Sequence, residues 1–240
     1  MIGPTRNAEV FSGSSQNKPE KWLKTAVLTV VALLLLIGSV LTQQLMPLGW
    51  NIAVTRAMQS VTLPGLHELM RLISGFGNAP KVIAITAIVL IASNKRRQAV
   101  FLTVCALGGW FLAMQLKNLF GVLRPDPGFV NVFHQWPNGS FPSGHLVFYV
   151  CYFGFLFSMA RHELPRGSVL RRCLMILTLT LIVMVGISRV YLGEHWISDL
   201  PGSYTLGAIC LAIALRLQRA WLHARRRQHD WFLPYRTADR

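Results

Sequence analysis

Apolar residues in this 240-residue chain fall into long runs that are separated by short polar stretches. A run of about 20 apolar residues is long enough to cross the hydrocarbon core of a bilayer as a helix. The runs that predict transmembrane helices cover residues 25–46, 77–94, 99–119, 142–159, 173–187 and 197–217. The pattern therefore predicts an all-α, polytopic membrane protein with six transmembrane helices.

Residues 47–79 show a different pattern, because apolar side chains alternate there with Arg56, His67, Glu68 and Arg71. Such a mixture predicts one or two short amphipathic helices that lie in the membrane interface, between the first and second transmembrane helices. His67 is expected to be a surface residue of such a helix, and the alternative is a further functional imidazole.

Composition supports a membrane domain, since 52% of the residues are hydrophobic and only 14% are charged. A soluble domain is usually about 25% charged. We expect a flexible polar N-terminus over residues 1–20, one membrane domain over residues 21–220 and a basic cytoplasmic tail over residues 221–240. Nothing in the sequence indicates an oligomeric state.

The formal charge of +15 is concentrated in four short segments that flank the apolar runs. These segments are residues 6–24, 95–97, 161–172 and 216–240. Basic loops of this kind are typical of the cytoplasmic side, and they lack the motif context of nucleic-acid binders. We therefore expect no nucleic-acid partner. Six crossings put both termini in the cytoplasm and the remaining polar stretches on the outer face of a bacterial inner membrane.

Three of those polar stretches are Lys117–Pro125, Pro142–His145 and Ser188–Asp199. They carry the cations Lys117, Arg124 and Arg189, which would repel one another unless an anion lay between them. A phosphate suits this set, because Arg offers a fork of donors and Lys a point charge. The alternative is that each cation meets a lipid head group separately.

Pro142-Ser143-Gly144-His145 is expected to open a helix, whose free N–H groups form an anion site. Gly144 allows close approach of a ligand, the Ser143 hydroxyl adds a donor, and His145 is directed at the bound group.

His195 and Asp199 are four residues apart and would share one face of a helix. A carboxylate that accepts from one imidazole nitrogen leaves the other nitrogen nucleophilic. Glu194 is expected to point elsewhere and to take no part. Zinc bound by His145, His195 and Asp199 is the competing interpretation, which the nearby cations disfavour, so we expect no metal and no cofactor.

The pattern Lys-x6-Arg-Pro, Pro-Ser-Gly-His and Ser-Arg-x5-His-x3-Asp resembles the three signatures of the type 2 phosphatidic acid phosphatase (PAP2) superfamily, in its integral membrane branch. The resemblance implies a metal-independent phosphohydrolase acting on lipid phosphates or pyrophosphates. It implies that His195 forms a phosphohistidine, that Asp199 orients His195, and that His145 protonates the leaving oxygen and later activates water. The implied phosphate-binding residues are Lys117, Arg124, Ser143, Gly144 and Arg189.

The substrate is expected to be a membrane lipid. Undecaprenyl pyrophosphate is favoured over phosphatidylglycerol phosphate, phosphatidic acid and lipid A phosphates. Residues 126–141 are expected to roof the site, with Phe133, His134 and Trp136 contacting the head group or the interface. A lipid phosphotransferase and a non-catalytic lipid-binding or transport protein are the alternatives, whereas the membrane spans disfavour a haloperoxidase.

Overall fold

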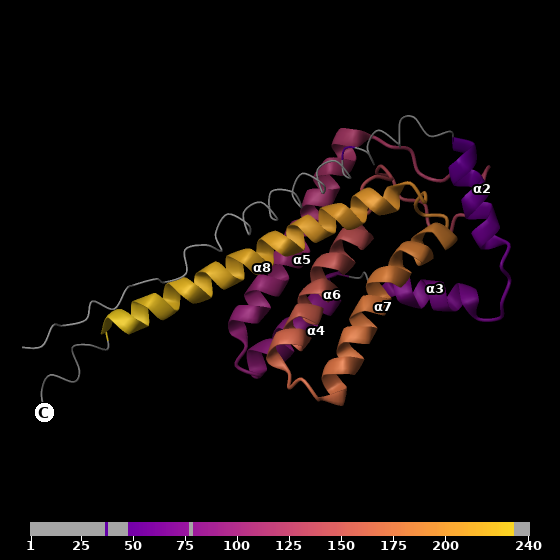
Figure 1. Ribbon diagram of the computed structural model, residues 1–240. Coiled ribbons are helices and arrows are strands. Elements are labelled where there is room, and N and C mark those ends of the chain that lie inside the picture. Colours follow the sequence, from indigo (N-terminus) through magenta and orange to yellow (C-terminus); the bar gives the residue numbers. More distant parts are fainter. Residues whose placement is uncertain (1–36, 38–47, 77–78, 233–240) are drawn as a thin grey trace, which may run out of the picture.

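The computed structural model describes residues 37, 48–76 and 79–232 of the chain. All regular elements in these ranges are helices, which confirms the all-α prediction (Figure 1). They are α2 (Leu48–Gln59), α3 (Leu66–Gly75), α4 (Ala79–Ala92), α5 (Arg96–Phe120), α6 (Gly144–Glu163), α7 (Val169–Tyr191) and α8 (Asp199–Phe232). The first transmembrane helix predicted from the sequence lies outside the described residues, apart from residue 37.

Helix α6 is the centre of the bundle and contacts α5, α7 and α8 (Figure 1). Its first half is buried on every side, as expected for a helix that is apolar all round. Neighbouring helices approach it closely at glycines. A Cβ atom on Gly109 of α5 would lie 2.7 Å from the Cys151 sulfur, and one on Gly207 of α8 would lie 2.7 Å from the Cβ atom of Val150. Side chains at these glycines would therefore push α5 and α8 away from α6.

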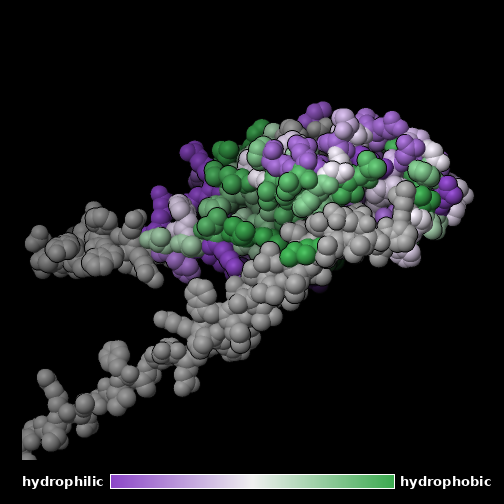
Figure 2. All heavy atoms as spheres, turned by 90° about the horizontal axis from the view of Figure 1, so that it is seen from above, coloured by the Kyte–Doolittle hydropathy of each residue, from purple (hydrophilic) through white to green (hydrophobic). Residues whose placement is uncertain are grey.

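Three helices of the described chain are long and apolar enough to cross a membrane, namely α5, α7 and residues Asp199–Arg225 of α8. Their outer faces carry exposed apolar side chains such as Val104, Leu179 and Ile213. Figure 2 shows hydrophobic residues across the middle of one face, with hydrophilic residues gathered towards both ends. The chain is thus a membrane protein, whereas the count of six crossings stays a prediction.

The antiparallel course of the helices places the three predicted polar stretches at one end of the bundle. The C-terminal ends of α5 and α7 lie there beside the N-terminal ends of α6 and α8 (Figure 1). The turns α4–α5 and α6–α7 lie at the opposite end, where Lys95 Nζ contacts Glu163 Oε2 at 2.5 Å. Helix α3 packs across α7 through Met70 and Ile73, which enclose Leu192. It adds a wall at the end that carries the polar stretches.

Helix α8 differs from its predicted range, because it begins at Asp199 and continues to Phe232 instead of ending near residue 217. The added turns are rich in Ala, Leu, Gln and Arg, which are strong helix formers. The helix therefore runs past residue 220 without a break, and the boundary proposed there for a cytoplasmic tail stays a prediction.

Candidate active site

A cavity of about 710 Å³ opens at the end of the bundle that carries the polar stretches. Six of the predicted site residues line it: Lys117, Arg124, Gly144, His145, Arg189 and His195. Ser143 and Asp199 lie behind this wall, the first next to Gly144 in the chain and the second bonded to His195. The fold therefore brings together three stretches that are far apart in sequence.

His195 and Asp199 form a buried pair, with 1% and 0% of their surfaces exposed. His195 Nδ1 lies 3.1 Å from Asp199 Oδ2, which also accepts the Trp196 N–H at 3.0 Å and the Ser140 hydroxyl. An ionised carboxylate can only accept, so the proton of the neutral imidazole lies on Nδ1 and Nε2 keeps its lone pair. Burial, followed by the nearby site cations, holds the pKa of His195 well below 6.5. The ring is therefore neutral.

The pairing does not arise from a shared helix face, and that part of the prediction is wrong. Helix α7 ends at Tyr191 and α8 begins at Asp199, so His195 lies in the turn between them. Gly193, with φ +64°, takes the left-handed conformation that commonly ends a helix. Asp199, as the first residue of α8, contacts the imidazole four residues earlier.

Glu194 was expected to point away from the site, and this expectation is also wrong. Its carboxylate lines the cavity, is 3% exposed and accepts from Arg189 Nη2. The same oxygen accepts the Trp136 indole N–H at 2.6 Å. The residue faces inward because it lies in the α7–α8 turn, where helical spacing does not apply.

Lys117 and Arg124 hold the segment above the cavity largely through backbone carbonyl groups. Lys117 Nζ donates to the carbonyl oxygens of Gly139 and Ser140 at 2.8 and 3.1 Å. Arg124 donates to the carbonyl oxygens of Asn138 at 2.8 Å and Glu194 at 2.6 Å. Burial lowers the pKa of Arg124 to about 10, which leaves it charged at neutral pH. Because an ammonium has three donors and a guanidinium five, both groups keep N–H bonds for a ligand.

Arg189 offers the clearest sign of an anion site. Its side chain is buried, and Nη1 donates to the Ser74 hydroxyl of α3 at 2.7 Å. Its Nε has no hydrogen-bond partner among the described residues, although it is shielded from solvent. Leaving a buried donor unpaired is costly. An oxyanion in the cavity would supply the missing acceptor.

Helix α6 begins at Gly144, with Ser143 as its N-cap. The Ser143 hydroxyl accepts the Leu146 N–H at 3.5 Å, and the backbone N–H of Ser143 donates to the Ser203 hydroxyl at 2.8 Å. Ser143 thus shapes the start of the helix from behind the cavity wall. A Cβ atom on Gly144 would lie 2.6 Å from the terminal methyl of Met114, so a side chain there would displace the end of Met114 at the cavity wall. His145 follows in the first turn and lines the cavity.

The segment 126–141 covers the cavity as the sequence suggested, and Phe133, His134 and Trp136 all line it. The Phe133 N–H donates to the Leu192 carbonyl at 2.9 Å. A side chain at Gly193 would collide with the Asn131 carbonyl oxygen. The roof is therefore fitted closely onto the turn that carries His195.

Among the polar residues at this site, sequence reasoning missed Arg71, Ser74 and Glu194, and it placed Ser140 only in the roof, without its bond to Asp199. Arg71 and Ser74 belong to α3, whose position against α7 has no local sequence signal. Ser140 lies only two residues before Pro142, and a polar residue so close to a motif was a usable signal. Among the described residues, no group of three His, Cys, Asp or Glu side chains is arranged to hold a metal ion.

Comparison with known proteins identifies the family. Residues 98–222, just over half of the chain, match the PAP2 superfamily, and the chain belongs to it. Phosphatidylglycerophosphatase B of Bacillus subtilis is 28% identical over 160 residues, which cover 65% of this chain and 77% of that protein. Undecaprenyl-diphosphatase of Sulfolobus acidocaldarius is 26% identical over 175 residues, which cover 71% and 80%.

The fold is shared with a solved relative, the transmembrane PAP2-type phosphatidylglycerolphosphate phosphatase from Bacillus subtilis. The TM-score is 0.68 at 24% identity, and the match covers 81% of this chain and 96% of the other. The resemblance found in the three motifs is therefore confirmed, and the chain is a PAP2-type lipid phosphatase.

Proposed function

We propose that this protein hydrolyses a membrane lipid phosphate or diphosphate through a phosphohistidine at His195. The observation that carries the proposal is that His145, from α6, and His195, from the α7–α8 turn, line one cavity into which buried cations also project. The unpartnered Nε of Arg189 supports an oxyanion as the natural occupant of this cavity.

In the proposed first step, the lone pair on His195 Nε2 attacks phosphorus and the bond from phosphorus to the lipid oxygen breaks. His145 gives a proton to the leaving oxygen. In the second step His145 takes a proton from water, which attacks phosphorus, and the P–N bond breaks to release phosphate. The site cations stabilise the phosphoryl oxygens, which carry more charge in both transition states.

The proposed substrate is a polyprenyl pyrophosphate such as undecaprenyl pyrophosphate. One relative is named for an undecaprenyl diphosphate and another for a phosphatidylglycerophosphate. A cavity of about 710 Å³ is within the usual range of ligand pockets, so it is large enough for a head group with more than one phosphate.

We further propose six crossings of a bacterial inner membrane, with both termini in the cytoplasm and the cavity on the outer face. The basic turns at residues 95–97 and 161–172 lie at the end of the bundle opposite the cavity, as the positive-inside rule requires. Helices α2 and α3, at the cavity end, would lie in the outer interface.

Phosphate release by the purified protein tests the proposal. In detergent with EDTA, the protein should release inorganic phosphate from a lipid phosphate, and His195→Ala should lower the rate by more than about 10³-fold. His162→Ala, which changes an exposed histidine at the far end of α6, is the matched control and should keep full activity. Strict dependence on added divalent metal, or an active His195→Ala protein, would contradict the mechanism. Transfer of labelled phosphate to a second lipid instead of water would favour the phosphotransferase.

A further inference from the structure

Helix α3 lies outside the three motifs yet contributes Arg71 and Ser74 to the cavity wall. The two residues are three positions apart and therefore share one face of the helix. Ser74 accepts from Arg189 at 2.7 Å and so supports a cation of the phosphate site. Arg71 forms no hydrogen bond or ion pair with another described residue, and its guanidinium carbon lies 4.7 Å from the centre of the Phe133 ring. Its donors are free for a ligand.

Arg71 and His134 lie at the mouth of the cavity, because both are exposed while Arg189 and His195 at its base are buried. The rings of His134 and Trp136 are 4.4 Å apart, and the Trp136 ring is 6.4 Å from that of His145. A line of aromatic groups therefore connects the mouth to the base.

The roof connects Arg71 at the mouth to the residues at the base. Arg71 packs on Phe133, and Trp136, three residues later in the chain, contacts the base through Glu194. Three residues span at most about 11 Å between Cα atoms. Arg71 is therefore linked to the base of the cavity by a short stretch of the roof, and it lines the same cavity as Arg189 and His195.

A second hollow begins where the cavity ends. This groove of about 570 Å³ is lined by residues that include Leu72, Phe76 and Val82, and it shares Arg71 and Gly75 with the cavity. Arg71 thus stands between the cationic base of the cavity and a largely apolar groove. A lipid with its phosphate at the base and its chain in the groove would pass this guanidinium.

We propose that Arg71, with His134 also at the mouth, forms a subsite for the lipid-proximal phosphate of a lipid diphosphate. The subsite rests on the proposed function, since it presumes attack by His195 on the terminal phosphorus. The P–O bond to the bridging oxygen then breaks, and its electron pair stays on that oxygen. Negative charge develops on the lipid monophosphate in the transition state, before His145 protonates it, and Arg71 stabilises that charge. A lipid monophosphate has no second phosphate at this place.

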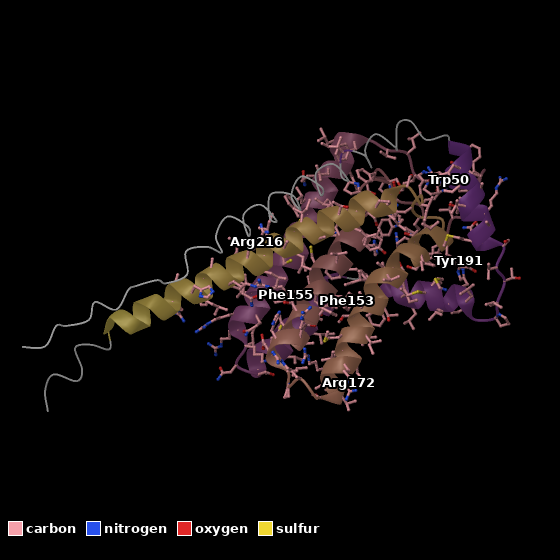
Figure 3. All side chains as sticks on the ribbon, in the orientation of Figure 1. Trp50, Phe153, Phe155, Arg172, Tyr191 and Arg216 are labelled. Carbon is pink, nitrogen blue, oxygen red and sulfur yellow. The ribbon has the colours of Figure 1, made fainter. Side chains whose placement is uncertain are left out.

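Comparing two substrates with one chain tests the subsite. For farnesyl diphosphate, Arg71→Ala should lower kcat/KM by about 10- to 100-fold, the range expected for lost hydrogen bonds to a charged group. For farnesyl monophosphate the loss should stay below about threefold, and Arg71→Lys should recover part of the diphosphate activity. Arg172→Ala, at the opposite end of α7 from Tyr191 (Figure 3), is the matched control. Equal losses on both substrates, or no loss on either, would overturn the subsite.

A binding measurement separates this proposal from the proposed function. In a His195→Ala background, inorganic pyrophosphate should raise the thermal unfolding temperature more than inorganic phosphate does, and adding Arg71→Ala should remove the difference. If the wild-type protein releases phosphate from no lipid phosphate or diphosphate, the farnesyl compounds included, the proposed function fails, while the difference between pyrophosphate and phosphate in unfolding temperature still reports the subsite. If pyrophosphate and phosphate stabilise equally when Arg71 is present, the subsite is wrong.

Discussion

The ion pair between Arg189 and Glu194 predicts a large and specific loss of stability when its carboxylate is removed. Both side chains are 3% exposed, and Glu194 also accepts from Trp136 at 2.6 Å. Removing one partner of a buried pair leaves an uncompensated charge, which destabilises a protein by about 3–5 kcal/mol. We therefore expect Glu194→Ala to lower the free energy of unfolding by about that amount.

The positive charge left on Arg189 explains why the loss of stability should shrink when Arg189 is also removed or when phosphate is bound. In Glu194→Ala, Arg189 stays buried beside other cations, whereas Arg189→Ala/Glu194→Ala removes both charges. The double variant should therefore lose less stability than the sum of the two single variants. Inorganic phosphate should restore stability to Glu194→Ala, because an anion in the cavity replaces the missing carboxylate; a ligand at 100 times its Kd contributes about 2.7 kcal/mol.

Thermal unfolding in detergent, followed by tryptophan fluorescence with and without phosphate, is the appropriate assay. For a chain of this length, a loss of 3–5 kcal/mol corresponds to a fall of about 6–20 °C in Tm. Glu163→Ala is the matched control, since its pair with Lys95 is partly exposed and such pairs contribute about 0–1 kcal/mol. A Glu194→Ala protein as stable as wild type, strictly additive losses, or equal stabilisation of both proteins by phosphate would show that the pair does not hold a buried charge in this way.

Four further predictions follow from the site and the arrangement of the helices. His145→Ala should slow hydrolysis of a lipid monophosphate more than of a diphosphate, because an alkoxide leaving group is far more basic than a phosphate and needs a proton on leaving, whereas a phosphate (pKa about 6) does not; rates on the two farnesyl substrates measure this. Because the pKa of His195 is lowered in the folded protein, the unfolded chain binds a proton below pH 6.5 that the folded chain does not bind. The contribution of His195 to stability should therefore fall as the pH drops below 6.5 and stay constant above it. In thermal unfolding, wild type should lose more stability than His195→Gln between pH 7.5 and 5. Gly193→Ala should reduce both stability and phosphate release, because its methyl group meets the Asn131 carbonyl, whereas Gly167→Ala, at an open position, should change neither. In a Cys173→Ser background, a membrane-impermeant maleimide should label Gln135→Cys in intact cells and Gly167→Cys only after lysis, and the reverse would contradict the proposed orientation.

Hydrophobic runs predicted most helices of the described chain, because their apolar length is a local property. The position of α3 was not predictable, since it depends on Met70 and Ile73 meeting Leu192 more than a hundred residues later. The same limitation hid Arg71 as a cavity residue. Only the fold shows that this turn of α3 faces the roof.

The motifs predicted which side chains meet, and local geometry decided how they do so. Helical spacing was assumed for residues 195–199, which placed the His195–Asp199 contact correctly for the wrong reason. The same assumption turned Glu194 away from the site. The glycine at position 193 was the available sequence signal that a helix ends before these residues, and in the structure it takes the left-handed conformation.

The way in which Lys117 and Arg124 hold the roof has an evolutionary consequence. Lys117 donates only to main-chain oxygens of residues 139 and 140, and two of the three bonds from Arg124 also go to main-chain oxygens. Every amino acid presents the same carbonyl group, so these bonds survive replacement of the side chains around them. Mutation can therefore alter Phe133 or His134 while the loop keeps its anchorage. Side chains over the cavity can thus differ while the cations beneath them stay in place.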